Sequence, residues 1–237
     1  PPGTCHATPG NWNNTVGLPL TLLGLRPEHR YAVVELGINR PGEMDQLAAA
    51  AEPDVALVTN AGPAHLEGLG GLEGVAREKG RIYGHVRPGG TAVINADSPY
   101  GEDWARGFSG PVWRFGLTAD ADLRGRWAPD GDGVWLAVEG APGGSYEVRV
   151  PLAGAHTASN ALAAAAVAAA LGIPADRVKA GLAGLAPPSG RLQPRPTSAG
   201  YTVLDDTYNA NPASLEAALA VLGEAGDGAA GRRWLVL

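Results

Sequence analysis

One lysine stands out among the residues of this sequence whose chemistry could serve a reaction. Lys79 is one of two lysines in a chain that otherwise uses arginine as its basic residue. When residues 74–86 are wound as a helix, Lys79 falls at apolar spacing (i, i+4, i+7, i+8, i+11) with Val75, Ile82, Tyr83 and Val86. A buried ammonium must be paired or lose its proton, because desolvation lowers the pKa of a lysine. A neutral amine there can react with carbon dioxide, and the resulting carbamate anion can bind a hard cation such as Mg²⁺.

Two other interpretations of Lys79 are consistent with the sequence. Its stem can cover apolar surface while the ammonium stays in water. It can also pair with Glu73 or Glu78 on the same helix. The helical spacing places Glu78, together with Arg77 and Arg81, outside the apolar face.

Polar residues also follow the predicted strands. Glu35 lies near the end of the sequence YAVVEL, and Thr59 and Asn60 end the sequence DVALVTN. His65 follows in a glycine-rich loop. Ligands of open α/β sheets bind beyond the carboxyl ends of the strands, and a carboxylate with an imidazole there can hold a divalent cation. Neither spacing is diagnostic alone, so Glu35 as a helix cap and His65 as an ordinary loop residue are the alternatives.

Two further segments predict contacts with a polar or anionic ligand. The sequence GAHTASN opens a long helix, whose N-terminus favours such ligands, and His156 and Asn160 can hydrogen-bond a base there. Arg191, in the sequence GRLQ, can reach a phosphate. In the alternative interpretation Asn160 only supports the helix cap, and Arg191 is an ordinary solvated arginine.

The densest polar cluster is LDDTYNANPAS, which directly follows an apolar strand. Its members Asp206, Tyr208, Asn209 and Asn211 exceed what turn formation requires, since a turn accounts for one Asn and the Pro. We therefore interpret the cluster as functional. The chain contains no GxxxxGK[ST] loop, no GxGxxG after a strand, and no CxxC or HExxH motif.

The elements that position these residues alternate between strand and helix. Apolar runs at 31–36, 54–60 and 91–97 read as buried strands separated by helices, which predicts an α/β fold with a parallel sheet flanked by helices. Residues 112–151 alternate apolar and polar side chains between glycine turns, which predicts a small antiparallel subsheet. Two helices follow, then a Pro/Gly-rich linker, and then the start of a second, Rossmann-like α/β domain. We expect domains at 1–186 and 187–237, with both ends of the chain truncated.

Composition limits the class of protein. The 237 residues, 45% of them hydrophobic and 18% charged, are typical of a globular protein with a sizeable core. A net charge of −6 argues against nucleic-acid binding, and the longest apolar run is too short to cross a bilayer. A single cysteine excludes an internal disulfide and favours a cytoplasmic location.

These segments, in this order, resemble the Mur ligase family over nearly the whole chain. The resemblance rests on TPGNWNNTVGLPLTLL, VVELGINRPGEM, TNAGPAHLEGLGG, VAREKGRIY, GAHTASNALAAAA, GRLQ and LDDTYNANPAS. It implies the central ATPase-type domain of the family and an ATP-dependent amide ligase of peptidoglycan precursor synthesis. Among the members, GNWNN and DDTYNANP favour one that adds D-alanyl-D-alanine to a UDP-muramoyl tripeptide through an acyl phosphate.

The resemblance also implies cofactors and residue roles. The cofactors are ATP and Mg²⁺, and the parent protein is expected to be a monomer with small-molecule substrates. Glu35 and His65 would hold Mg²⁺ with Lys79 as a carbamylated lysine, and Arg191 would touch the γ-phosphate. The nucleotide would be bordered by His156, Asn160, Asp206, Tyr208, Asn209 and Asn211. The other substrates would lie near Asn13, Asn14, Thr59 and Asn60.

This sequence departs from the family pattern in one respect. The phosphate loop of the family precedes the TPGNWNN segment and is not found here, so we expect the polypeptide as given to be inactive alone. Three alternatives are another Mur-type ligase, such as the meso-diaminopimelate-adding enzyme, a folylpolyglutamate-type ligase, and a non-catalytic homologue that binds a partner or a nucleotide.

Overall fold

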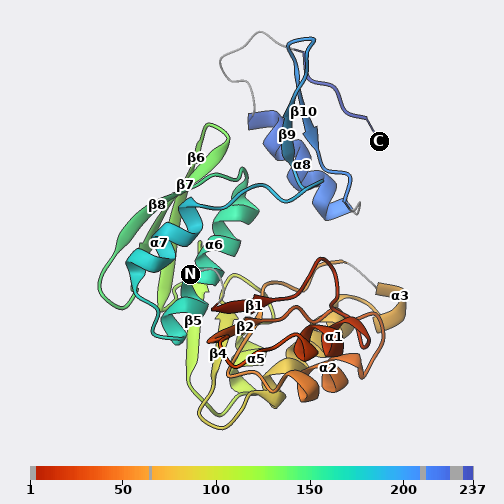
Figure 1. The fold of residues 1–237 in the computed structure, drawn as a ribbon, viewed down its shortest axis with the longest axis vertical. Helices are drawn as coiled ribbons and strands as arrows, with labels where there is room; N and C mark the ends of the chain where they lie inside the picture. Colours follow the sequence, from red (N-terminus) through yellow and green to blue (C-terminus); the bar gives the residue numbers. More distant parts are fainter. Residues whose placement is uncertain (1–3, 64–65, 209–211, 225–231, 237) are drawn as a thin grey trace. The chain divides into compact units, whose positions relative to one another are not determined.

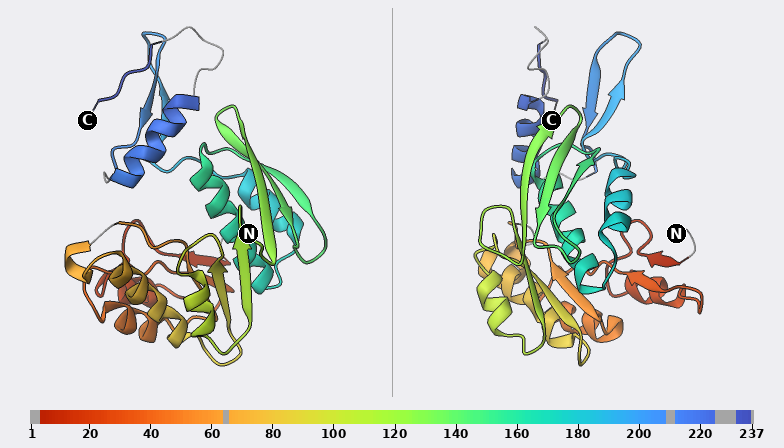
Figure 2. Two further views of the ribbon diagram at one scale, coloured as in Figure 1. Left: turned by 180° about the vertical axis from the view of Figure 1, so that it is seen from behind. Right: turned by 90° about the vertical axis from the view of Figure 1, so that its left-hand side faces the viewer.

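The computed structural model describes residues 4–63, 66–208, 212–224 and 232–236 (Figure 1, Figure 2). The chain divides into two compact units, Pro1–Val112 and Trp113–Leu237, and each is considered by itself. The predicted domain boundary at 186/187 falls inside the second unit and stays a prediction.

The first unit alternates short strands with helices, as the apolar runs predict. Its elements are β1 (Cys5–Ala7), α1 (Gly17–Leu23), β2 (Tyr31–Val33), α2 (Glu43–Ala51), β3 (Val55–Val58), α3 (Leu66–Leu69), α4 (Leu72–Gly80), the 3₁₀ helix η1 (Arg81–His85), β4 (Thr91–Asn95) and α5 (Gly101–Arg106). Strands β1 and β2 pair in parallel, with Cys5 opposite Tyr31, and β3 and β4 pair in parallel, with Val55 opposite Thr91. The predicted α/β class with parallel pairing is confirmed.

The core of the first unit lies around β3 and β4. Strand β4 is buried along four of its five residues, and its partner β3 alternates buried with half-buried positions. Apolar side chains of the surrounding helices complete the cluster, including Leu18, Met44, Leu47, Val75, Ile82, Tyr83 and Trp104. This accounts for the continuous apolar runs in the sequence, because a strand covered on both faces has no polar side.

The helix that carries Lys79 differs in one respect from the prediction. Val75, Ile82 and Tyr83 are buried as expected, but Glu78, predicted to face outward, is only 4% exposed. Glu78 lies on α4 three residues after Val75, a spacing that places both side chains on the same side of the helix, and its carboxylate accepts hydrogen bonds from the start of α2. The prediction that Glu78 lies outside the buried face is wrong.

The second unit is built on an up-and-down set of strands covered by helices. Its elements are β5 (Val112–Gly116, whose first residue belongs to the first unit), β6 (Leu123–Asp130), β7 (Gly133–Glu139), β8 (Tyr146–Val150), α6 (Ala155–Ala170), α7 (Ala175–Ala183), β9 (Gln193–Pro196), β10 (Thr202–Asp205) and α8 (Pro212–Glu224). Strands β6, β7 and β8 pair antiparallel, which confirms the predicted subsheet. Strand β5 instead pairs with β6 in parallel, with Phe115 opposite Leu123.

Helix α6 packs against β6, β7 and β8 and fills the core of the second unit (Figure 1). The small alanine side chains of α6 suit a close approach to the sheet. The approach is close at Gly125 of β6, where an added Cβ would lie 2.9 Å from the Leu162 side chain of α6. The strands contribute fully buried side chains such as Phe115, Leu123 and Leu136. The long alanine-rich stretch is therefore a core helix of this unit.

The C-terminal part of the second unit contains a hairpin and a helix. Strand β9 pairs antiparallel with β10, with Gln193 opposite Asp205. The segment predicted as a linker thus ends in a strand, because its extended proline-rich backbone finds a partner in the predicted strand that follows. The predicted strand and helix of the second α/β domain are present as β10 and α8.

Candidate functional site

Lys79 lies next to the C-terminal end of α4, and its side chain reaches the end of β3. Its Nζ donates a hydrogen bond of 2.9 Å to the backbone oxygen of Asn60. Burial lowers the pKa of the Lys79 amine below its ordinary value. Pairing with Glu78 is wrong, because that carboxylate bonds to α2 and Arg81, and among the described residues Lys79 forms no ion pair. The result is a half-buried amine that gives up its proton more readily than an ordinary lysine.

The ends of β1 and β2 bring together two residues predicted for different roles. Asn13 Nδ2 donates a hydrogen bond of 2.7 Å to Glu35 Oε1. The Glu35 backbone N–H donates to Thr8 Oγ1 at 2.8 Å, and the Gly37 N–H donates to the Asn13 backbone oxygen at 2.7 Å. These bonds hold the exposed Glu35 carboxylate beyond the strands. In the described part of the chain, the Glu35 side chain is bonded to Asn13 and not to the start of a helix.

Asn14 has a structural contact of its own. Its Oδ1 accepts hydrogen bonds from the backbone N–H groups of Val16 at 3.0 Å and Gly17 at 2.8 Å. These N–H groups open α1 and have no partner within the helix, so Asn14 caps it. A contact between Asn14 and substrate stays a prediction.

The ends of β3 and β4 are joined through an asparagine that the sequence reasoning missed. Asn95 is buried, and its Nδ2 donates a hydrogen bond of 2.8 Å to the backbone oxygen of Thr59. Its Oδ1 accepts from the Asp97 N–H at 3.0 Å. The Thr59 and Asn60 backbone oxygens thus face protein donors. His65, which follows in the chain, lies outside the described residues.

In the second unit the predicted GRLQ segment lies beside Asp206 and Tyr208, two described residues of the other predicted polar cluster. The Arg191 guanidinium sits 4.2 Å from the centre of the Tyr208 ring. The Tyr208 N–H donates to the Gly190 oxygen at 2.9 Å, and the Leu192 N–H donates to Asp206 Oδ1 at 3.1 Å. A cation, an aromatic face and a carboxylate are therefore gathered where the sequence predicted contacts with ATP.

The start of α6 carries the other two described residues of the predicted nucleotide site. Burial lowers the pKa of His156, and the nearby Asp206 carboxylate opposes that shift by favouring the charged imidazole. This interaction connects α6 to the Arg191–Tyr208 group. Asn160 lines a cavity of about 410 Å³ between α6, α7 and β8. Asn209 and Asn211 lie outside the described residues.

Comparison with known proteins decides the family. The model of the Mur ligase middle domain matches residues 3–168, more than half of the chain. The chain belongs to the Mur ligase family. Its resemblance to the family, stated above from the motifs, is confirmed.

Several Mur ligases that are similar to this chain are named as D-alanyl-D-alanine-adding enzymes. The UDP-N-acetylmuramoyl-tripeptide--D-alanyl-D-alanine ligase of Escherichia coli K12 is 43% identical over 225 residues, covering 94% of this chain and 50% of the relative. The crystal structure of MurF from Acinetobacter baumannii matches with a TM-score of 0.89 at 37% identity, covering 94% of this chain and 49% of that one. MurF from Thermotoga maritima, solved in complex with ADP, matches with a TM-score of 0.79 at 29% identity, covering 93% and 51%. The chain spans about half the length of the relatives it matches.

The described residues fit the Mg²⁺ that the Mur ligase resemblance implies under one condition. Glu35 offers carboxylate oxygen, the ligand type that this cation prefers. An ammonium cannot ligate a cation, so Lys79 fits only as a carbamate. No group of three or more His, Cys, Asp or Glu side chains that could hold a metal occurs within the described ranges. A magnesium site on Glu35 and a carbamylated Lys79 therefore stays a prediction.

The sequence reasoning also missed Glu78, which a helical wheel places outside the apolar face. Its position three residues after Val75 was a local signal, whereas its partners, the N–H groups at the start of α2, are distant in the sequence. Among the described residues, none of the helices is long and apolar enough to span a membrane.

Proposed function

We propose that the full-length protein containing this chain joins D-alanyl-D-alanine to a UDP-muramoyl tripeptide at the expense of ATP. The proposal is supported by the activity for which the relatives are named, one of them the E. coli ligase at 43% identity, and by the similar structure solved with ADP. The observation that carries it is the Lys79 amine, which is half-buried, bonded to Asn60 and has a lowered pKa.

Amide formation of this kind needs cations, because the negatively charged substrate carboxylate and the ATP phosphates must approach each other. A substrate carboxylate attacks the γ-phosphorus of ATP, ADP leaves, and the dipeptide amine then displaces phosphate from the acyl phosphate. Each step brings negative groups together, and positive charge must offset their repulsion. Mg²⁺, when bound, supplies this neutralisation.

Lys79 would serve the site as an anion. Its neutral amine would add to carbon dioxide and release a proton, and the resulting carbamate, with Glu35 and His65, would hold the metal ion. A guanidinium never provides a free amine at neutral pH, which explains why this position carries lysine in an arginine-rich chain. Asn13 would orient Glu35 through the hydrogen bond of 2.7 Å and border the muramoyl substrate, with Asn14, Thr59 and Asn60 close to it.

The second unit would bind the nucleotide. Arg191, stacked on Tyr208, would contact the γ-phosphate, and the adenine and ribose would lie near His156, Asn160, Asp206, Tyr208, Asn209 and Asn211. A similar structure solved in complex with ADP supports an adenine nucleotide as ligand. We further propose a cytoplasmic location, because the single cysteine, Cys5, is free. The family resemblance leads us to propose a monomer.

A substrate panel tests the proposed function. Full-length protein is incubated with ATP and Mg²⁺, and separate reactions receive UDP-muramoyl tripeptide with D-alanyl-D-alanine, UDP-muramoyl dipeptide with meso-diaminopimelate, or folate with glutamate. We expect ADP release and product formation with D-alanyl-D-alanine alone. Activity only with another amine, or with folate and glutamate, would assign a different ligase. Nucleotide binding without any turnover would assign a non-catalytic homologue.

A further inference from the structure

Glu78 is a buried carboxylate directly before Lys79. Among the residues that the structure describes it is the one charged residue in the buried class, at 4% exposure. Its Oε1 accepts hydrogen bonds from the N–H groups of Gly42 at 2.7 Å and Met44 at 3.0 Å, where α2 begins, and its Oε2 lies 3.4 Å from Arg81 Nε. Because burying a carboxylate is costly unless it is bonded and paired, these contacts explain how it is tolerated.

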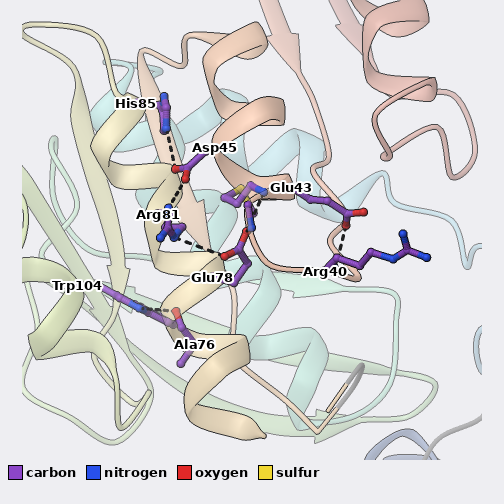
Figure 3. A network of polar contacts seen from close by, with 10 residues as sticks. Arg40, Glu43, Asp45, Ala76, Glu78, Arg81, His85 and Trp104 are labelled. Atoms are coloured by element: carbon purple, nitrogen blue, oxygen red, sulfur yellow. Dashed lines mark hydrogen bonds and ion pairs between the residues drawn. The ribbon is translucent and has the colours of Figure 1, made fainter. Parts of the chain in front are cut away.

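The contacts of Glu78 belong to a longer network between α2 and the α4–η1 segment (Figure 3). Arg81 also forms an ion pair with Asp45 of α2. The other oxygen of Asp45 lies 3.0 Å from His85 Nε2, near the end of η1. Three side chains, at the end of α4 and along η1, therefore attach this segment to α2.

A different contact holds α4 against α5. Trp104 Nε1 donates a hydrogen bond of 3.1 Å to the Ala76 backbone oxygen. The indole packs so closely on α4 that a Cβ added at Gly80 would lie 2.5 Å from Trp104 Cδ1. Glu78 and Trp104 thus restrain α4 through two neighbouring helices, and neither contact involves the Lys79 side chain.

We infer that Glu78 is a positioning residue, which fixes the rotation of α4 and thereby directs the Lys79 amine to the end of β3. Successive residues of an α-helix point about 100° apart, so anchoring Glu78 on α2 sets the direction of its neighbour. Lys79 accordingly reaches the Asn60 oxygen at 2.9 Å. The inference rests on the proposed function in that it makes Glu78 necessary for efficient carbamate formation at Lys79.

The electrostatics of Glu78 are compatible with an anion at the next residue. Its negative charge is offset by the Arg81 guanidinium and by the N–H groups at the start of α2, where the helix dipole is positive. A carbamate on Lys79 would therefore face little repulsion from it. Glu78 itself is enclosed by protein, so it acts through Lys79 and does not touch substrate.

The test compares Glu78→Gln with Glu73→Gln in the full-length protein. Glutamine keeps an acceptor for α2 but loses the charge that pairs with Arg81, whereas Glu73 is an exposed acid on the same helix. We expect Glu78→Gln to lower kcat about 10-fold, as loss of an outer partner of a metal ligand does, with KM for ATP nearly unchanged. Added bicarbonate should restore kcat, and the ¹³C-carbamate signal of protein in ¹³C-bicarbonate should weaken in parallel. Glu73→Gln should match wild type in all three measurements.

Unchanged kcat and an unchanged carbamate signal in folded Glu78→Gln would overturn the inference while leaving the proposed function intact. If circular dichroism shows that Glu78→Gln does not fold, Arg81→Lys gives the same readout, because it retains the charge but loses the planar contacts to Glu78 and Asp45. If wild type itself gives no carbamate signal, the role proposed for Lys79 fails. In that case the positioning role is tested by the NMR signal of the Lys79 ¹³Cε atom, which is identified by its loss in Lys79→Arg. This signal should shift in Glu78→Gln. An unshifted signal would overturn the inference.

Discussion

Lys79 is the residue on which the proposed chemistry depends. We expect Lys79→Arg to lower ligase activity by at least about 100-fold, because charge neutralisation by a metal ion is worth several kcal/mol and arginine cannot form the carbamate. Lys79→Ala should lose activity equally and regain part of it with a short carboxylic acid such as formate. Steady-state assays of the full-length protein measure both effects.

The other lysine provides a matched control for this prediction. Lys179 lies on α7, and Lys179→Arg makes the same chemical change outside the proposed site. It should keep wild-type activity. Full activity of Lys79→Arg, or an equal loss in Lys179→Arg, would contradict the role assigned to Lys79.

The pKa of His156 should respond to Asp206. Burial holds this pKa below its ordinary value of 6.5, and the Asp206 carboxylate limits the shift. Asp206→Asn should lower the pKa of His156 further, as followed by NMR titration of its ring protons. A depressed pKa gives stability above pH 6.5 that is lost as pH falls through the folded value, so this loss should deepen in the variant. Asp176→Asn, on α7, should leave the titration unchanged.

Most chemically suggestive residues were visible in the sequence, but their partners were not. The spacing around Lys79 indicated a partly buried amine, and Asp206 and Tyr208 of the predicted polar cluster lie beside the Arg191 segment. The bond between Asn13 and Glu35 joins residues 22 positions apart, which no local pattern encodes. Glu78 was misplaced because its burial depends on the free N–H groups of a different helix.

At the scale of elements, Tyr83 connects β3 with β4. Its hydroxyl accepts a hydrogen bond from the Val58 N–H and donates one to the Val93 oxygen, both at 3.1 Å, and the residue is 4% exposed. Tyr83→Phe leaves two buried backbone groups without this partner, at about 1–3 kcal/mol for each. We expect the free energy of unfolding to fall accordingly in urea titrations.

The stabilisation by Tyr83 should also depend on pH. Burial raises the pKa of Tyr83 far above its ordinary value of 10.0, so the folded protein keeps the phenol neutral while the unfolded chain ionises. Its contribution to stability is complete below pH 10 and is lost as the pH rises from there toward the raised pKa of the folded state. The difference between wild type and Tyr83→Phe should therefore shrink above pH 10. Tyr100→Phe, at a half-buried position, should change stability little, and an equal loss in both variants would contradict the argument.

The elements themselves were largely predictable where apolar runs were long. Strand β4 and helix α6 follow from continuous apolar stretches, since burial on both faces leaves no room for polar side chains. Strand β9 was taken as linker because its sequence, QPRP, has no apolar period and forms a strand only by pairing with β10. The parallel pairing of β5 with β6 was not predictable either, because the residue pattern of a single strand does not specify the direction of its partner.

At the scale of the whole molecule, family membership came from the order of the motifs rather than from any single one. The family match at residues 3–168 and the likeness to MurF at a TM-score of 0.89 agree with that order. Composition alone indicated only a globular acidic protein. The chain covers about half of its relatives, so the complete reaction is proposed for the full-length protein.

The most direct test is a crystal structure of the full-length protein grown with Mg²⁺, ADP and bicarbonate. We predict a planar carboxyl group covalently attached to Lys79 Nζ, with a magnesium ion in contact with it and Glu35 nearby. An unmodified ammonium that still donates to the Asn60 oxygen, with magnesium held by other residues, would contradict it.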